Sequence, residues 1–330
     1  PKGPPKMAND FYTPLEAARV AANLANEDAF LSALVSRNFA NDLMGGGKGG
    51  APIAIKIPTT LIAREREIDD ITSSIVMDEI AEQSVTLNLD RVMDYHAANL
   101  SEADLALNLT DFSAQVLAPQ TAAVVDQLEH KLATKLLAVP ETELMSSGAT
   151  PAPIAYDPAN PTAYFTQIRK TLRKNGVAVN GLNMLVGAEV YANLLDAKAI
   201  EDASASGSTA ALREGGVGKV RGFNVVESTR IPDAEILAFH RDAVTLATRA
   251  PVVSPGAKFG ATVSEKGFSL RYLRDYLTEK TVDRSFVSTF SGIAILPTYK
   301  VSRNYTTRQV EVTEVENGGI LHLNVSEAVA

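Results

Sequence analysis

Apolar residues change their spacing along the chain, and the first pattern predicts a helical arm. Thr13, Pro14 and Glu16 form a typical helix start, since a Thr hydroxyl can cap and Pro suits the first helical position. Apolar residues then follow at roughly helical spacing, from Val20 and Leu24 onward. The glycine-rich stretch 45–50 predicts a flexible hinge. Its glycines are Gly45, Gly46, Gly47, Gly49 and Gly50.

After the hinge the spacing becomes two, which is typical of β-strands. Residues 53–57 (IAIKI) alternate in this way, and residues 85–89 (VTLNL) do so again. A long polar and acidic stretch separates these two predicted strands. The pattern predicts an extended hairpin arm. Such an arm buries little of its own surface, so we expect it to find support on a neighbour.

The rest of the chain alternates helices and strands. Leucines and valines recurring every four residues from Val124 predict a long amphipathic helix that ends near Ala138. A linker rich in Pro, Ser and Gly, 140–161, leads into a mixed lobe. The predicted helices of this lobe are 161–175 and 188–197, and its predicted strands are 182–186, 223–226, 235–239 and 244–247. Further strands are predicted at 105–109, 268–277 and 285–296. The tail predicts a hairpin of 308–315 with 320–325, joined across 316–319.

Composition removes several kinds of chemistry. The 330 residues are 45% hydrophobic and include no Cys, which excludes disulfides, thiolate metal sites and a Cys nucleophile. The four His are too scattered along the chain to suggest a metal cluster. No apolar stretch approaches the ~18 residues of a membrane span. We predict no catalytic, cofactor-binding or metal-binding residues, no cofactor and no membrane partner.

Glycine-rich motifs do not predict nucleotide binding. The stretch around Lys48 lacks the Ser or Thr that a phosphate-binding loop needs directly after its Lys. Gly216 and Gly218 begin like a dinucleotide fingerprint, but Arg221 occupies the third glycine position.

The acidic charge is concentrated in one region. The net charge is −8, which argues against a dedicated nucleic-acid reader. Residues 51–150 hold six basic and sixteen acidic side chains, most densely between Arg64 and Asp70. One interpretation is a solvated surface. The other is an arm that meets basic patches on another subunit.

Six segments occur in an order that identifies a family resemblance. They are 13–19 (TPLEAAR), 85–89 (VTLNL), 111–112 (DF) with 116–119 (VLAP), 218–226 (GKVRGFNVV), 238–243 (AFHRDA) and 269–276 (SLRYLRDY). Over about residues 8–297 the chain resembles the tailed-bacteriophage major capsid (coat) proteins with the HK97-type fold. More narrowly, it looks like coat proteins of phages that infect actinobacteria.

The resemblance implies an α+β fold with an N-terminal arm, an extended β-hairpin loop, a long spine helix, and peripheral and axial domains. The implied division is 1–50 for the N-terminal arm, 51–100 for the extended loop hairpin, 101–140 for the spine helix of the peripheral domain, 141–250 for the axial domain, 251–297 for strands returning to both domains, and 298–330 for a C-terminal β tail.

The resemblance also implies a function. The chain would be made in the bacterial host cytoplasm, would self-assemble into hexamers and pentamers of an icosahedral shell, and would enclose double-stranded DNA in the virion. Implied partners are a scaffolding protein, a portal and, as further candidates, decoration proteins. DNA would be held without sequence-specific binding. The acidic charge of the chain suits this role, because a strongly basic inner wall would bind phosphates tightly and oppose packaging.

The acidic arm supplies the predicted intersubunit contacts. These are Arg64, Glu65, Arg66, Glu67, Asp69 and Asp70. Candidate basic counterparts are Arg169, Arg173, Arg271 and Arg274. Exposed ion pairs contribute only ~0–1 kcal/mol each, so their repetition over a lattice would be what counts.

Two alternatives stay open beside the shell subunit. One is the same fold used as an encapsulin-like compartment, which would co-purify with enzyme cargo in place of DNA. The other is a soluble α+β enzyme using carboxylates, which would show turnover that is lost on mutation of one Asp or Glu.

Overall fold

The structure is a computed structural model, and its described residues form two compact units. Unit 1 comprises Pro1–Ile53, Asn88–Thr134 and Thr245–Ile293, and unit 2 comprises Ala54–Leu87, Lys135–Val244 and Ala294–Ala330. The residues described are 13–37, 53–57, 63, 65, 68–72, 74, 75, 77, 83–89, 92–100, 112–147, 150–197, 218–257, 259–265, 267–278, 282–303 and 310–326. The hinge glycines, the predicted strand 105–109, and Arg64, Arg66 and Glu67 lie outside them. Within the described part of the chain, no helix is long and apolar enough to cross a membrane.

Helix α1 (Pro14–Asp28) begins unit 1 at the predicted capping box. The Thr13 hydroxyl accepts a hydrogen bond from the Glu16 N–H at 3.3 Å, and the Glu16 carboxylate accepts one from the Thr13 N–H at 2.7 Å. The hydrogen bonds that the Thr13 N–H and hydroxyl donate to the Glu16 carboxylate lower the pKa of Glu16. The buried face of α1 is made of alanines rather than of Val20 and Leu24, which are only half-buried. The fully buried alanines are Ala17, Ala18, Ala21, Ala22 and Ala25.

The alanine face of α1 packs against a five-stranded sheet. The sheet has the order β3–β11–β10–β9, with β8 also paired to β11. The strands are β3 (Met93–Leu100), β8 (Val244–Arg249), β9 (Phe259–Glu265), β10 (Phe268–Leu277) and β11 (Val282–Ile295). β10 runs antiparallel to both β9 and β11, and β11 runs antiparallel to β3. Small side chains at the helix surface allow its backbone to approach the strands closely.

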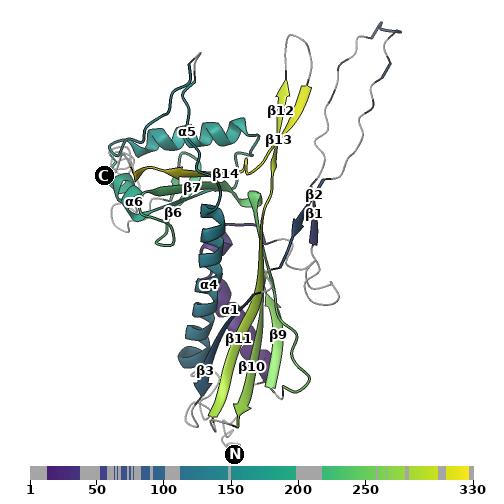
Figure 1. Ribbon diagram of the computed structural model, residues 1–330, viewed down its shortest axis with the longest axis vertical. Coiled ribbons are helices and arrows are strands. Elements are labelled where there is room, and N and C mark those ends of the chain that lie inside the picture. The colour runs from purple at the N-terminus through teal and green to yellow at the C-terminus, as the bar shows by residue number, and fades with distance from the viewer. Residues whose placement is uncertain are drawn as a thin grey trace, which may run out of the picture. The chain divides into compact units, whose positions relative to one another are not determined.

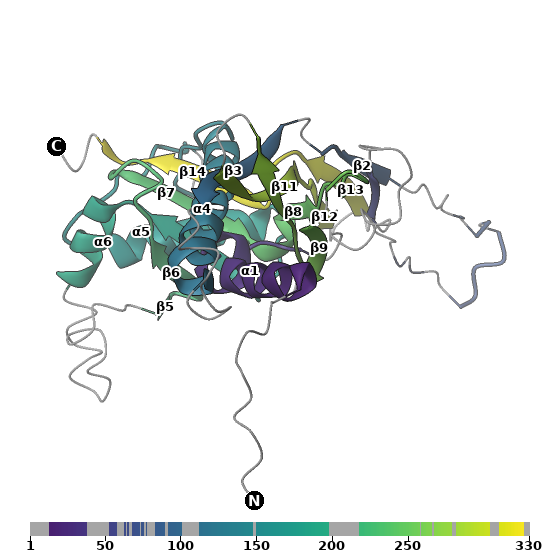
Figure 2. The same ribbon diagram turned by 90° about the horizontal axis from the view of Figure 1, so that it is seen from below.

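The predicted long helix is α4 (Ala118–Leu137), which follows a π-helical turn, η3 (Ser113–Leu117). Figures 1 and 2 both show α1 and α4 running alongside the strands of the unit 1 sheet. Gln120 fixes α4 to β11, because its side-chain amide donates to the Ser285 carbonyl at 3.3 Å and accepts from the Ser285 hydroxyl at 2.6 Å. The Glu129 carboxylate accepts the Leu31 N–H at 2.7 Å and so holds the short 3₁₀-helix η1 (Leu31–Ala33).

A buried ion pair also joins α4 to the sheet of unit 1. Asp94 on β3 is 4% exposed, and its Oδ1 lies 2.7 Å from Nζ of Lys131 on α4. The other carboxylate oxygen accepts the Ser291 hydroxyl from β11 at 3.0 Å. β3 was not predicted. Residues 93–100 were placed in the extended loop, because small and polar residues blur their alternation.

Unit 2 is built on a second five-stranded sheet, of order β14–β7–β4–β6–β5. Its strands are β4 (Leu182–Val186), β5 (Lys219–Val220), β6 (Phe223–Glu227), β7 (Glu235–His240) and β14 (Ile320–Asn324). β4 runs parallel to β6 and antiparallel to β7, and each of its residues is buried, as predicted. Helices α5 (Pro161–Lys174) and α6 (Ala188–Leu195) contribute apolar residues to the same core. α5 ends at the predicted glycine stop, where Gly176 has φ +86° and an added Cβ would lie 2.5 Å from the Tyr299 carbonyl oxygen.

The predicted tail hairpin is wrong. The chain does turn at 316–319, where Asn317 has φ 54°. However, β13 (Val310–Val315) pairs with β12 (Thr298–Arg303), whereas β14 pairs with β7 in the core sheet. The turn residues determine only where the chain reverses. The partner of each strand is determined by burial, because β14 is buried except at Asn324, whereas the described part of β13 is partly exposed.

Candidate functional site

The arm in unit 2 begins from a small two-stranded sheet. β1 (Ile53–Ile57) pairs with β2 (Gln83–Leu87), which confirms the two strands predicted at its base (Figure 1). Ile55 and Leu87 are buried, while Lys56 and Thr86 are exposed, so the period of two reflects one covered face. This base fixes the segment between the strands at both ends.

Beyond this base, the arm carries an exposed apolar patch. It consists of Ile68, Ile71, Ile75 and Met77, with exposed fractions of 101%, 92%, 76% and 88%. Burying a side chain of this size stabilises by roughly 1.5–3 kcal/mol, and four such side chains left in water on one short segment favour an interaction surface. The patch is therefore the strongest candidate contact surface among the described residues.

The charged residues of the arm are less able to form strong contacts. Glu65 and Asp69 are exposed. The Asp70 carboxylate accepts hydrogen bonds from the Thr72 N–H and hydroxyl at 2.9 and 3.0 Å, in a local turn. Asp70 therefore shapes the arm, while Glu65 and Asp69 remain candidates for contacts with a neighbour.

The candidate basic counterparts all make bonds within their own unit. In unit 2, Arg169 donates to the Arg221 carbonyl at 2.7 Å and Arg173 donates to the Val177 carbonyl at 2.5 Å. In unit 1, Arg274 lies 3.8 Å from a carboxylate oxygen of Asp283 and 4.6 Å from the Phe259 ring centre. The predicted pairing of these arginines with the arm lies between subunits and stays a prediction.

Arg271 belongs to a second candidate surface, an aromatic and arginine cluster on the unit 1 sheet. Its guanidinium donates to the Val252 carbonyl at 2.8 Å, and burial lowers its pKa. The Arg271 and Arg284 guanidinium carbons both lie 5.7 Å from the Phe286 ring centre, and Phe286 stacks on Tyr95 with centres 5.3 Å apart. Tyr95 is 60% exposed, so an aromatic ring lies in contact with solvent on this face, close to the Arg271 and Arg284 guanidinium groups.

The sequence predicted contacts by the charged residues of the arm and not by the apolar patch. Ile68 and Ile71 directly flank the acidic pair Asp69 and Asp70, so the apolar residues lie beside the charged ones that were predicted. Ile68, Ile71 and Ile75 have the i, i+3, i+7 spacing of one helix face, but the described residues of this segment form no helix. Large apolar residues within a polar and acidic segment were the available signal.

Comparison with solved structures identifies the fold. A chain from a structure of Mycobacterium phage Che8 is 18% identical, has a TM-score of 0.57, and aligns over 90% of this chain and 92% of its own. A chain from the capsid structure of Cyanophage P-SCSP1u is 11% identical, has a TM-score of 0.51, and aligns over 83% of both chains. No protein-family model matches the sequence, and the comparison with curated proteins gives no match.

These similarities span most of the chain, and both units contribute to them. At identities of 18% and 11% they establish the fold and not the activity. The predicted α+β, HK97-type capsid fold is confirmed.

Proposed function

We propose that this chain is a major capsid protein, which self-assembles into the icosahedral head shell of a bacteriophage. The observation that carries this proposal is the exposed patch Ile68, Ile71, Ile75 and Met77, on an arm of a subunit with a capsid fold. An isolated subunit would leave four large apolar side chains in water. A lattice in which each arm lies on the next subunit would bury them in every copy.

The proposal assigns roles to the parts of the chain. The arm, confined to 53–87 because β3 belongs to the unit 1 sheet, is the extended loop that contacts a neighbour. Residues 101–140 contain the spine helix, and 141–250 supply most of the axial domain around hexamer and pentamer centres. Residues 251–297 return to both domains, and 298–330 add strands that include β14 of the unit 2 sheet.

The proposed partners follow from a shell role. A second copy of the chain is the main partner, and a scaffolding protein, a portal and decoration proteins are further ones. The net charge of −8 suits a wall that encloses double-stranded DNA without holding it, because phosphate contacts dominate the affinity of proteins for DNA. The chain would then reside in the virion after synthesis in the host cytoplasm, and we assign it no catalytic role.

Electron microscopy of the expressed chain tests this function. We expect closed shells, sheets or rings of regular subunits, formed alone or with the scaffolding protein co-expressed. A chain that stays a monomer at high concentration with its scaffold present would contradict the proposal. Shells that enclose a companion enzyme in place of DNA would replace it with the encapsulin-like compartment.

We also expect the shell to be held by non-covalent contacts alone. Some capsids of this fold join their subunits through a Lys in the extended loop and an Asn elsewhere. No Lys lies between Lys56 and Lys131, so the loop segment beyond β1 offers no amine. A denaturing gel of mature particles should show one band at the 35.1 kDa of the chain. A ladder of multimers would contradict this prediction.

A further inference from the structure

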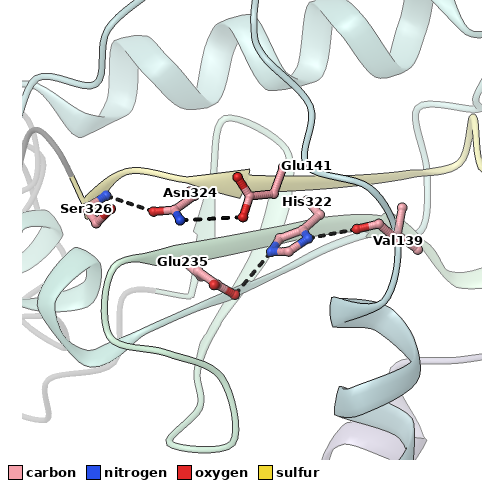
Figure 3. Close-up of polar contacts among 6 residues, drawn as sticks. All are labelled: Val139, Glu141, Glu235, His322, Asn324 and Ser326. Atoms are coloured by element: carbon pink, nitrogen blue, oxygen red, sulfur yellow. Dashed lines mark hydrogen bonds and ion pairs between the residues drawn. The ribbon is translucent and has the colours of Figure 1, made fainter.

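One histidine and two glutamates from separate segments of unit 2 meet beside β14. Glu141 follows α4 in the chain, Glu235 begins β7, and His322 lies in the middle of β14. An isolated bridge places Glu141 next to His322, and the pairing of β14 with β7 brings Glu235 alongside. One potential ligand atom from each side chain lies within 4.8 Å of the other two. Figure 3 shows the three side chains beside β14.

The hydrogen bonds of His322 determine which ring nitrogen carries a proton. Its side chain is buried, with the residue 5% exposed, and Nδ1 lies 2.8 Å from the Val139 carbonyl oxygen. A carbonyl oxygen can only accept, so Nδ1 carries the proton. In the neutral ring Nε2 then has a lone pair, and this lone pair faces Oε2 of Glu235 at 3.1 Å. Nε2 and Oε2 can therefore share a proton, as an ion pair of imidazolium and carboxylate, or they can share a metal ion.

The three side chains together make a donor set for a divalent ion. Glu235 lies against the buried ring with its side chain 14% exposed, and Glu141, which is exposed to water, would supply the other carboxylate oxygen. Zn²⁺ and related first-row ions bind the neutral imidazole nitrogen and carboxylate oxygens together, so the donor set fits this class of metal.

Neighbouring groups already orient these ligands. Histidines that bind metals usually donate their other ring N–H to a carbonyl or carboxylate, which is the bond that His322 makes to Val139. Asn324, two residues along β14, directs its side-chain amide at Oε1 of Glu141 at 3.5 Å. These contacts come from outside the three ligands, and they match the outer shell of a metal site.

We propose that Glu141, Glu235 and His322 bind one divalent transition-metal ion of the Zn²⁺ class. The ion would connect the segment that follows α4 to β7 and β14, within unit 2. The sequence prediction of no metal site relied on the separation of the histidines along the chain. Glu141 and Glu235 are instead 181 and 87 positions from His322 in the sequence, and the topology of the sheet brings the three residues together. This inference is independent of the shell function.

Metal titration of the full-length chain, after dialysis against a chelator, tests the site. We expect calorimetry to give one Zn²⁺ per chain. Co²⁺ should give a visible absorption band, and Zn²⁺ should raise the thermal midpoint, because a ligand that binds only the folded state stabilises it. Glu141→Gln should weaken Zn²⁺ binding at least ~10-fold, since even outer-shell substitutions cost 10–100-fold. Glu141 is exposed, so the variant is expected to fold, and circular dichroism checks this.

Glu143→Gln is the matched control, because Glu143 is exposed, carries the same charge and lies only two residues from Glu141. Its Zn²⁺ affinity should equal that of the wild type. The proposal is overturned if the wild type takes up no stoichiometric metal. The contact between His322 Nε2 and Glu235 would then be held by a proton. Equal affinities for wild type and Glu141→Gln would overturn it as well. Particle formation in the same samples, followed by microscopy, tests the shell function separately.

Discussion

The double variant Ile68→Ser, Ile71→Ser is expected to abolish particle formation while the subunit stays folded. Both side chains are more than 90% exposed in the subunit, so their loss changes the free energy of unfolding by at most ~0.5 kcal/mol. In an assembly each would contribute ~1.5–3 kcal/mol of burial to every arm contact. Losing both weakens each contact by more than 100-fold. Sedimentation and electron microscopy measure assembly, and thermal unfolding measures the fold.

A charge variant of the same segment is the control. Glu65→Gln with Asp69→Asn removes two exposed carboxylates and keeps both side-chain shapes. Exposed ion pairs contribute ~0–1 kcal/mol, so we expect particles to form with a modestly changed dependence on salt. If the charge variant fails to assemble while the serine variant assembles normally, the arm contacts are electrostatic, and the role of the apolar patch is contradicted.

Asp94→Ala is expected to lower the free energy of unfolding by about 3–5 kcal/mol, the largest stability effect that we predict. The substitution leaves the Lys131 ammonium, whose side chain is 20% exposed, without its carboxylate partner at 2.7 Å. It also removes the acceptor of the Ser291 hydroxyl. Urea unfolding of the unassembled chain gives the change directly.

The double variant Asp94→Leu, Lys131→Met separates the pair from its surroundings. It replaces both charges with apolar groups, so no uncompensated ammonium remains, and we expect it to recover most of the lost stability. Asp69→Ala is the matched exposed control and should change stability by less than ~0.5 kcal/mol. A loss below 1 kcal/mol for Asp94→Ala would contradict the assigned role of the ion pair.

Elements with a clear period and a local stop signal were predicted well. β10 has its predicted bounds, 268–277, and α5 ends one residue before the predicted end because Gly176 takes a left-handed conformation that few other residues adopt. Where side chains are small, the period disappears. The buried face of α1 is alanine, and β3 mixes alanines with polar residues, so neither buried surface appears in a pattern of large apolar positions.

Partners distant in sequence could not be predicted, because periodicity describes one element at a time. The turn at 316–319 is real, but the choice of β7 rather than β13 as the partner of β14 depends on the whole unit 2 core. The same limit hid the meeting of His322 with Glu141 and Glu235. In the arm, by contrast, Ile68 and Ile71 could have been selected from the sequence, because they are large apolar residues in a segment that is otherwise polar and acidic.

The position of β14 also has a consequence for synthesis. This strand is residues 320–324, and it pairs with β7, which was made more than 80 residues earlier. A chain still growing on the ribosome therefore leaves one edge of β7 without its partner. The sheet of unit 1 also forms late in synthesis. Its strand β11 lies between β3 and β10 in the sheet but follows both of them in the chain. Neither sheet is complete before its last strand has been made, which is β11 in unit 1 and β14 in unit 2, so truncated products that lack these strands are expected to stay out of any assembly.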